Sequence, residues 1–466
     1  MAVLICAAAA SLPAWCSGLK VQLLTTQTKK ADSTALRIRV SWNDSWRNER
    51  NYDAAWVFLS YRKPGGLWRP ALLRSAAGHE AVVDIPDDRA GAFLYPRAAH
   101  RGSVDWTLEV RVDPSSLTEV TTGEQVEWAV FGVEMVYIPE GAFWVGDRDP
   151  KAMEMNAFYR SDADGNPAGL LRIESEREIQ VGAREGALLY KVTDPIYQGD
   201  GGGPVPEEFP KGFRAFYLMK YELTQGQYAE FLNHISTQAT YFRAIHGGLD
   251  YKANRGTIDV KDGRFIAGAP ARPANFVSWN DGIAFAAWAR LRPMTEFEYT
   301  KASRGPGEPV NGDYPWGTAS KAHLQRLIVA PNDDLITPGE ATLTNATREV
   351  FGASYYWVMD LAGSVWERVV TPAAPVGRAF RGTHGNGRLT GFGSATNADW
   401  PQGDEAPGGY GYRGGGYYAH GFNAGELNPH SRTEWRRFGA WGQGPRSVAY
   451  GFRAARTAPI LQTHVP

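Results

Sequence analysis

The protein has 466 residues, of which 43% are hydrophobic and 21% are charged, and its formal net charge at pH 7 is -1. A chain of this length exceeds one ordinary domain, and a balanced charge gives no basis for binding nucleic acid or an anionic membrane surface. Beyond the first residues no apolar stretch is long enough for a membrane span, so we expect no transmembrane span.

The first 18 residues are apolar and rich in alanine, and polar sequence begins at Lys20. This pattern is typical of a secretory signal, although its usual positively charged start is missing, and it predicts a secreted or cell-surface protein. The two cysteines, Cys6 and Cys16, both lie in this segment. Removal of residues 1–18 would leave no thiol for a disulfide or a metal site. The true N-terminus and lipidation of Cys16 stay open.

Residues 19–133 show short apolar or alternating runs separated by turn residues, which predicts an N-terminal all-β sandwich. The expected strands are 21–24, 35–42, 54–61, 81–85 and 104–112. Trp56 stands inside an apolar run and is predicted to be buried. Trp46 has polar neighbours on both sides and is predicted to lie in an exposed loop.

A second domain is predicted over residues 134–460. It opens at residues 135–147 with an apolar run, a Pro-x-Gly turn and an aromatic run. Residues 148–212, rich in Gly, Pro and acidic side chains, are predicted to be an insertion that acts as a lid, a partner contact or a flap.

Three helices are predicted in this second domain. The first begins at Thr224, which caps apolar residues at helical spacing. The second covers 279–290, and the third begins at Thr295, where Glu298 completes a capping box.

A set of short motifs follows in a fixed order along the second domain. They are 216–224, 277–279, 292–299, 314–317, 355–367, 413–417 and 451–456. Together they resemble the formylglycine-generating enzyme, or sulfatase-modifying factor, family, whose fold is related to C-type lectins. The resemblance covers about residues 135–457. It implies an α+β fold class: the sandwich plus a C-type-lectin-related domain rich in irregular loops.

The resemblance also implies which chemistry is missing. Enzymes of this family oxidise a client cysteine to formylglycine with two cysteines that bind copper(I), a soft ion that selects thiolates. The matching positions here are Ala419 and Ala424. We therefore expect no bound copper and no catalytic residue of that type. The absence of both cysteines argues against an enzyme.

Calcium is the cation that the resemblance does imply. The family's Gly-Asn-x-Trp-Glu turn binds Ca²⁺, and the matching turn here supplies Ser364, Val365 and Glu367. Serine in place of asparagine weakens such a site, but calcium accepts mixed carbonyl and carboxylate oxygens. The alternative is that Glu367 only accepts hydrogen bonds from nearby backbone amides.

The segment 412–446 is the expected ligand face, because Tyr, Trp and Arg make binding hot spots and relatives with C-type-lectin-like folds bind ligands through this region. Whether this segment is diversified stays open. The candidate residues are Tyr417, Tyr418, His420, Asn423, Glu426, Trp435, Arg436, Arg437, Trp441 and Arg446.

Three functions remain open at this point. The first is a pseudoenzyme that binds a protein or glycan partner through this face. The second is a structural subunit that self-assembles or joins a larger extracellular complex. The third is an oxidoreductase with a non-cysteine metal site that uses His384, His420 or Glu426.

Overall fold

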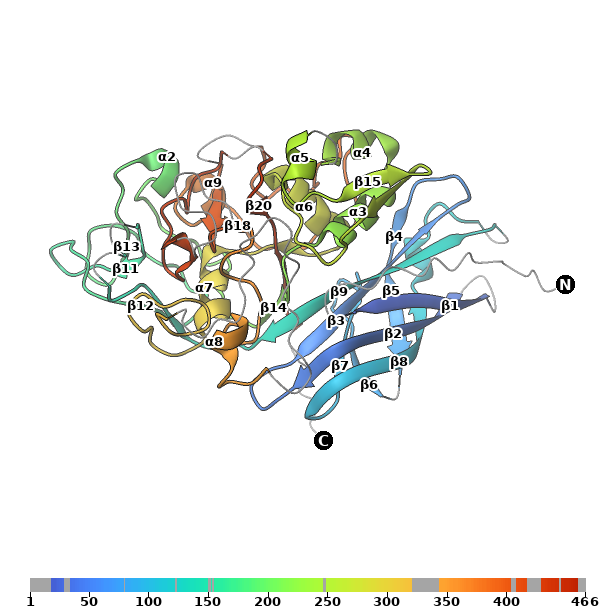
Figure 1. The fold of residues 1–466 in the computed structure, drawn as a ribbon, viewed down its shortest axis with the longest axis horizontal. Coiled ribbons are helices and arrows are strands. Elements are labelled where there is room, and N and C mark those ends of the chain that lie inside the picture. The colour runs from blue at the N-terminus through green and yellow to red at the C-terminus, as the bar shows by residue number, and fades with distance from the viewer. Residues whose placement is uncertain are drawn as a thin grey trace.

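A computed structural model describes most of the chain (Figure 1). The described residues are 18–28, 34–78, 80–121, 124–149, 152, 155–245, 249–320, 343–403, 408–416, 429–443 and 446–459. The fold is mixed α+β, with many strands and few helices. The predicted signal segment lies outside the described residues, except for Gly18. Among the described residues, no helix is both long and apolar enough to cross a membrane.

A four-stranded sheet forms the outer layer of the N-terminal part, with the order β1-β2-β8-β5. Its strands are β1 (Lys20–Thr28), β2 (Thr34–Arg47), β5 (Leu73–Ala77) and β8 (His100–Val112). Along β8, buried and exposed residues alternate, so one face of the sheet is in solvent and the other packs inward. The inward face shares a buried apolar cluster with the next sheet.

The second sheet contains strands from both the N-terminal and the C-terminal part of the chain. It has eight strands, in the order β17-β21-β14-β9-β3-β7-β6, with β4 paired to β3. They are β3 (Asp53–Arg62), β4 (Arg69–Ala71), β6 (Ala81–Asp84), β7 (Ala92–Pro96), β9 (Glu127–Ile138), β14 (Phe216–Met219), β17 (Arg292–Pro293) and β21 (Ala454–Thr457). The predicted boundary after residue 133 falls inside β9, which pairs with β3 on one side and β14 on the other.

Strand β3 is buried on both faces, because its two sets of side chains enter different cores. Val57 and Leu59 join the cluster between the two sheets, whereas Trp56 and Phe58 join the core of the C-terminal part. The predicted strands of residues 19–133 are confirmed, and so is the burial of Trp56.

The prediction for Trp46 is wrong. Strand β2 continues past a bulge between Trp42 and Ser45, which turns the Trp46 side chain inward. There it packs against Trp357 with 4.7 Å between ring centroids, and its backbone N–H donates to Asp53. A bulge of this kind leaves no clear mark in a polar stretch of sequence.

A buried ion cluster lies where β3, β9 and β14 meet. The Lys220 ammonium, directly after β14, lies 2.6 Å from Glu134 on β9 and 3.4 Å from Asp53 on β3. Asp53 also accepts hydrogen bonds from Trp42 and Ser45. The two parts of the molecule are therefore joined by charges as well as by backbone pairing.

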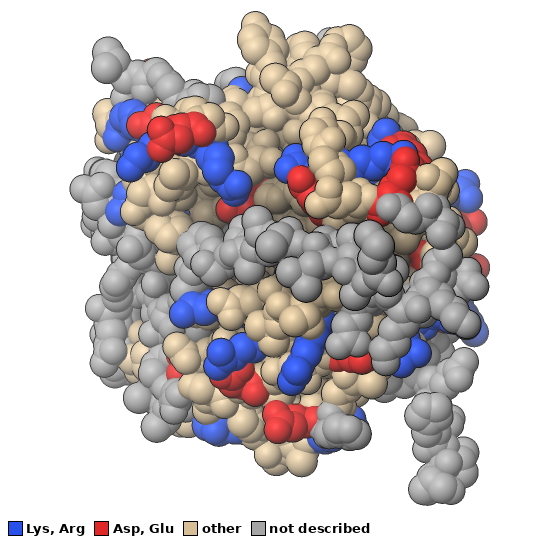
Figure 2. Space-filling model, turned by 90° about the vertical axis from the view of Figure 1, so that its right-hand side faces the viewer, with Lys and Arg blue, Asp and Glu red and all other residues tan. Residues whose placement is uncertain are grey.

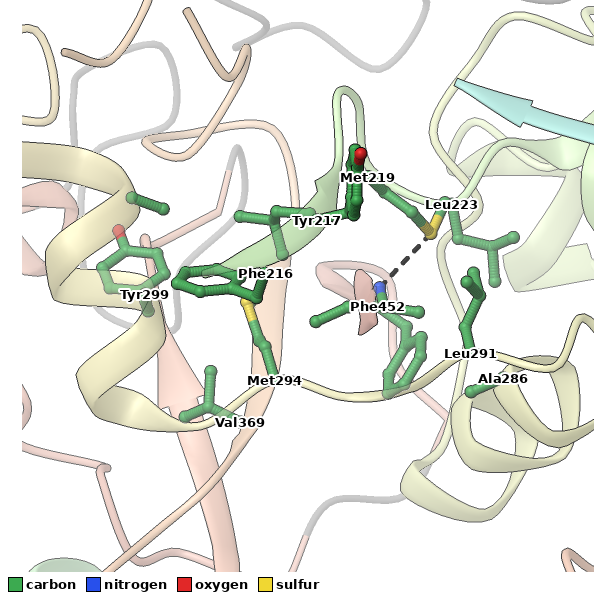
Figure 3. Packing of buried hydrophobic residues seen from close by; sticks show 14 of the residues in the cluster. Phe216, Tyr217, Met219, Leu223, Ala286, Leu291, Met294, Tyr299, Val369 and Phe452 are labelled. Atoms are coloured by element: carbon green, nitrogen blue, oxygen red, sulfur yellow. Dashed lines mark hydrogen bonds between the residues drawn. The ribbon is translucent and has the colours of Figure 1, made fainter. Parts of the chain in front are cut away.

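The three predicted helices are present as α3 (Gln225–Asn233), α6 (Trp279–Trp288) and α7 (Glu296–Arg304), each with a capping box at its start. They contribute to one buried core that also contains Phe216, Met294 and Phe452, with Met294 beside Phe216 (Figure 3). Gly282 of α6 faces Phe452 so closely that a Cβ there would lie 2.3 Å from the ring.

Short elements complete the chain between these larger ones. They are η1 (Pro114–Ser116), β10 (Phe143–Val145), β11 (Tyr159–Arg160), β12 (Leu171–Ile173), β13 (Leu188–Leu189), α2 (Pro195–Gln198), α4 (Thr237–Arg243), α5 (Leu249–Ala253), β15 (Ile258–Lys261), β16 (Arg264–Ala267), α8 (Arg348–Phe351), β18 (Trp366–Val370), α9 (Pro375–Arg378), β19 (Tyr410–Arg413), η2 (Pro429–Ser431) and β20 (Tyr450–Gly451).

The segment 148–212 folds back onto the C-terminal part. Arg436 donates its backbone N–H to Met155, and Ala440 donates to Tyr197 of α2. The Tyr197 ring packs against Phe438 and Trp441, with centroids 5.7 and 5.8 Å away. This segment therefore covers part of the predicted ligand face.

Candidate functional site

A small sheet of three strands brings the predicted site segments together. Strand β18 pairs antiparallel with β19 and parallel with β20. The turn before β18 is held to the turn after β19, because Gly363 donates its backbone N–H to the Gly414 carbonyl at 2.9 Å. Ser364 has a φ of 52°, a left-handed conformation that is uncommon for serine.

Glu367 belongs to the first residue pair between β18 and β19, and its side chain lies fully buried beside Arg453. The Arg453 guanidinium donates to one Glu367 oxygen from both Nε and Nη2, at 2.9 and 2.6 Å. Its remaining N–H groups donate to the backbone carbonyls of Met219, Lys220, Met359 and Asp360. Arg453 thus connects two chain segments, 219–220 and 359–360, to the Glu367 carboxylate.

Glu222 adds a second buried carboxylate to this centre. One of its oxygens accepts the backbone N–H of Val365 at 3.1 Å. Burial, with repulsion from Glu367 and Asp360, raises the pKa of Glu222 well above its usual range. Burial also raises the pKa of Glu367, against the opposing effect of Arg453. With both carboxyls ionised, the centre would hold more negative charge than Arg453 balances.

Two carboxylate oxygens in this centre are buried and have no hydrogen-bond partner, Oε2 of Glu222 and Oε2 of Glu367. The Ser364 hydroxyl lies close enough to Glu222 to favour the ionised form of that carboxyl. Within the described ranges, no three His, Cys, Asp or Glu side chains converge as a complete metal site. A cation here would rest on the Glu222 and Glu367 carboxylates and the Ser364 hydroxyl. Calcium accepts such a mixed oxygen set, so the residues present fit a calcium ion.

Glu222 was not among the sequence-predicted metal residues, although it lies in one of the quoted motifs. The available signal was an acidic residue at the end of the apolar run 216–223. Acidic side chains are rarely fully buried without a partner, so an acidic residue inside an apolar run indicates a buried polar site.

The described residues of the predicted ligand face do not form one open surface. Arg436 is fully buried and makes a bidentate pair with Glu296, at 2.8 and 2.9 Å. Trp435 is buried, and Arg446 makes two hydrogen bonds to Asp281, at 2.7 and 2.8 Å. Arginines that fasten a segment to its own core offer little to a partner.

Arg437 and Trp441 remain accessible: Arg437 is exposed and Trp441 is partly buried. The other candidates, Tyr417, Tyr418, His420, Asn423 and Glu426, lie outside the described residues, and so do Ala419 and Ala424.

His384 lies at the seam with the N-terminal part. Its Nδ1 is 3.6 Å from Asp88, and its Nε2 accepts the backbone N–H of Thr457. Burial, with repulsion from Arg456, lowers its pKa to about 3. A neutral imidazole held between Asp88 and Thr457 has a structural role, and these contacts lie outside the Glu222–Glu367 centre.

Known proteins resemble this chain over most of its C-terminal part. The family model described as "Sulfatase-modifying factor enzyme 1-like domain" matches residues 129–458. A formylglycine-generating enzyme of Thermomonospora curvata is 26% identical over 238 residues, which cover 50% of this chain and 69% of that protein.

Shorter matches point the same way. The inactive C-alpha-formylglycine-generating enzyme 2 of Mus musculus is 32% identical over 112 residues, 23% of this chain and 35% of that protein. The hercynine oxygenase of Mycobacterium tuberculosis is 33% identical over 108 residues, 22% of this chain and 23% of that protein. Since the family model covers well over half of the sequence, the chain belongs to the sulfatase-modifying factor family.

Proposed function

We propose that this protein is a family member without cysteine-based oxidase activity, exported from the cell, that binds a protein or glycan partner. One observation carries the proposal: no cysteine follows Cys16, so residues 129–458 contain none. Copper(I) chemistry of the family type needs thiolates, which alanine at 419 and 424 cannot supply. The similarity to a mouse protein that is itself named inactive supports this reading.

Loss of oxidase activity is tested with the full chain, copper(I), oxygen and a cysteine-containing sulfatase peptide. Mass spectrometry should find only the unmodified thiol, while the Thermomonospora curvata enzyme converts the same peptide. Aldehyde formation above the copper-only background would contradict the proposal.

Binding is proposed to use the accessible part of the C-terminal face, around Arg437 and Trp441. Chemical cross-linking in the source cells should capture a partner at this face, and Arg437→Glu with Trp441→Ala should abolish the adduct. Arg74→Glu, an exposed arginine of β5, is the matched control. Particles made of many copies of this chain alone would favour the structural-subunit alternative instead.

Export is checked by sequencing the N-terminus of the mature protein.

A calcium ion at Glu222, Ser364 and Glu367 is part of the proposal, supported by the unpartnered carboxylate oxygens of Glu222 and Glu367. When bound, it would neutralise the buried carboxylates and brace the turn before β18. We expect calcium to raise the Tm of the full chain relative to EDTA, and Glu367→Gln to remove that rise. An equal Tm with calcium and with EDTA would argue against the site.

A further inference from the structure

Three aromatic rings form an exposed cluster at α4, away from the sites described so far. The exposed fractions are 82% for Tyr241, 39% for Phe242 and 60% for Phe392. The Phe242 ring contacts both neighbours at 5.3 Å between centroids, and each neighbour is nearly perpendicular to it, at 88° and 81°. Single exposed apolar residues are ordinary, but three rings in contact mark a surface for interaction.

Contacts with Arg446 and with the turn at Gly393 hold the cluster in a fixed position. Arg446 donates to the backbone carbonyls of Phe242 and Ala244 while its guanidinium pairs with Asp281. Phe392 stands in a tight turn that lies against α4, where a Cβ on Gly393 would come within 2.9 Å of the Arg243 side chain. A rigid arrangement lowers the entropy lost when a ligand binds.

The cluster carries no net charge of its own that could select an ionic partner. Arg243 is the one charged residue of α4, and it is buried and directed at Asp281 at 3.0 Å. In Figure 1, α4 lies at the top of the right-hand half, and the uppermost part of the face in Figure 2 is almost free of charged side chains. Phosphate, nucleic acid and anionic lipid all favour basic surfaces, so none of them fits.

The size of the cluster also restricts the partner. A stable protein interface takes about 800 Å² from each side and some 20–30 residues, far more than three side chains. A sugar ring, by contrast, has an apolar C–H face that covers a single aromatic ring. Its hydroxyl groups would find Gln238, which is exposed one helical turn before Tyr241 and Phe242.

We propose that Tyr241, Phe242 and Phe392 bind a neutral oligosaccharide, with one sugar ring lying in the corner between perpendicular rings. This site uses neither Arg437 nor Trp441, and it does not depend on the proposed function. It gives Arg446 the role of positioning α4.

The test uses the full chain with cellohexaose, chitohexaose and mannohexaose, by saturation-transfer NMR and titration calorimetry. We expect at least one to bind, with affinity reduced about tenfold or more by Tyr241→Ala and by Phe392→Ala. Tyr241→Phe, which keeps the ring, should stay close to the parent affinity. Leu67→Ala removes a separate residue that is 54% exposed and should change nothing.

Several results would overturn the proposal. They are no binding of the three oligosaccharides at millimolar concentration, unchanged affinity in both alanine variants, or equal loss in Leu67→Ala. Self-association that disappears in Tyr241→Ala would show that a second copy covers the cluster. Sedimentation with phosphatidylcholine vesicles, lost in the same variant, would show a lipid surface instead. Circular dichroism of each variant separates loss of the ligand from loss of the fold.

Discussion

At the scale of single residues, the buried charges decide what the centre around Glu367 can do. Arg453 donates to one oxygen of Glu367 and to four carbonyls, but Glu222 and Glu367 each keep one oxygen with no hydrogen-bond partner. The sequence motif predicted Glu367 as a calcium ligand. It did not predict Glu222, because no local pattern in the sequence indicates that residues 222 and 367 lie close together in the fold. Sequence reasoning also placed Arg436 on a ligand face, because arginine is frequent in binding hot spots; its partner Glu296 lies 140 residues away.

The raised pKa of Glu222 predicts a specific pH dependence. The folded protein keeps a proton on Glu222 at pH values where the unfolded chain, with a glutamate pKa of about 4.3, has released it. Without calcium, the free energy of unfolding should therefore fall as pH rises above that value towards the folded pKa. Glu222→Gln has no such proton to lose and should be more stable than the parent at pH 8 in EDTA.

Urea unfolding between pH 5 and pH 8 measures this effect. Calcium should reduce the difference between parent and variant, because the cation balances the same charge. Glu308→Gln, an exposed glutamate, should behave like the parent. Identical pH profiles for the parent and Glu222→Gln would refute the buried-acid explanation.

At the scale of elements, local signals predicted the helices well. Thr224 and Thr295 each cap the helix that follows, because a side-chain oxygen and an N3 side chain satisfy free backbone N–H groups at the helix start. These interactions lie within four residues and can be read directly. Trp46 could not be placed this way, since the bulge that turns it inward depends on pairing between β2 and β8.

Helix α6 offers a test of close packing. Gly282→Ala would place a methyl group 2.3 Å from the Phe452 ring, so we expect a loss of about 1–3 kcal/mol in the free energy of unfolding. Alanine's better helix propensity, about 1 kcal/mol, opposes this loss. Gly307→Ala, with no atom within 4 Å of the added Cβ, is the control. A stability equal to or above the parent would show that Phe452 moves aside freely.

At the scale of the whole molecule, the two predicted parts share one sheet. The motif order was enough to predict the C-terminal family, which the family model confirms. The shared sheet was not predicted, since an apolar run such as 129–138 shows that a strand is buried but not which strands lie beside it.

This arrangement predicts that residues 129–458 do not fold well alone. Removing residues 1–126 would take β3 away from β9 and expose Phe131, Val133 and Met135. Unpaired strands with apolar faces tend to aggregate. We expect the shortened chain to be insoluble or to lose its cooperative thermal transition, while removal of residues 1–17 alone leaves both intact. A soluble 129–458 fragment with a sharp transition would contradict this expectation.

The ion cluster at Lys220 has a consequence for how the sheet assembles. Side chains of a strand repeat their faces every two residues, so β9 shifted by two positions would still send apolar groups into the same cores. Such a shift would, however, carry Glu134 away from Lys220 and leave an ammonium group buried without its nearest carboxylate. The buried ion cluster of Lys220, Glu134 and Asp53 therefore specifies the strand register. It distinguishes the native alignment of β9 from slipped alignments that hydrophobic burial alone would tolerate.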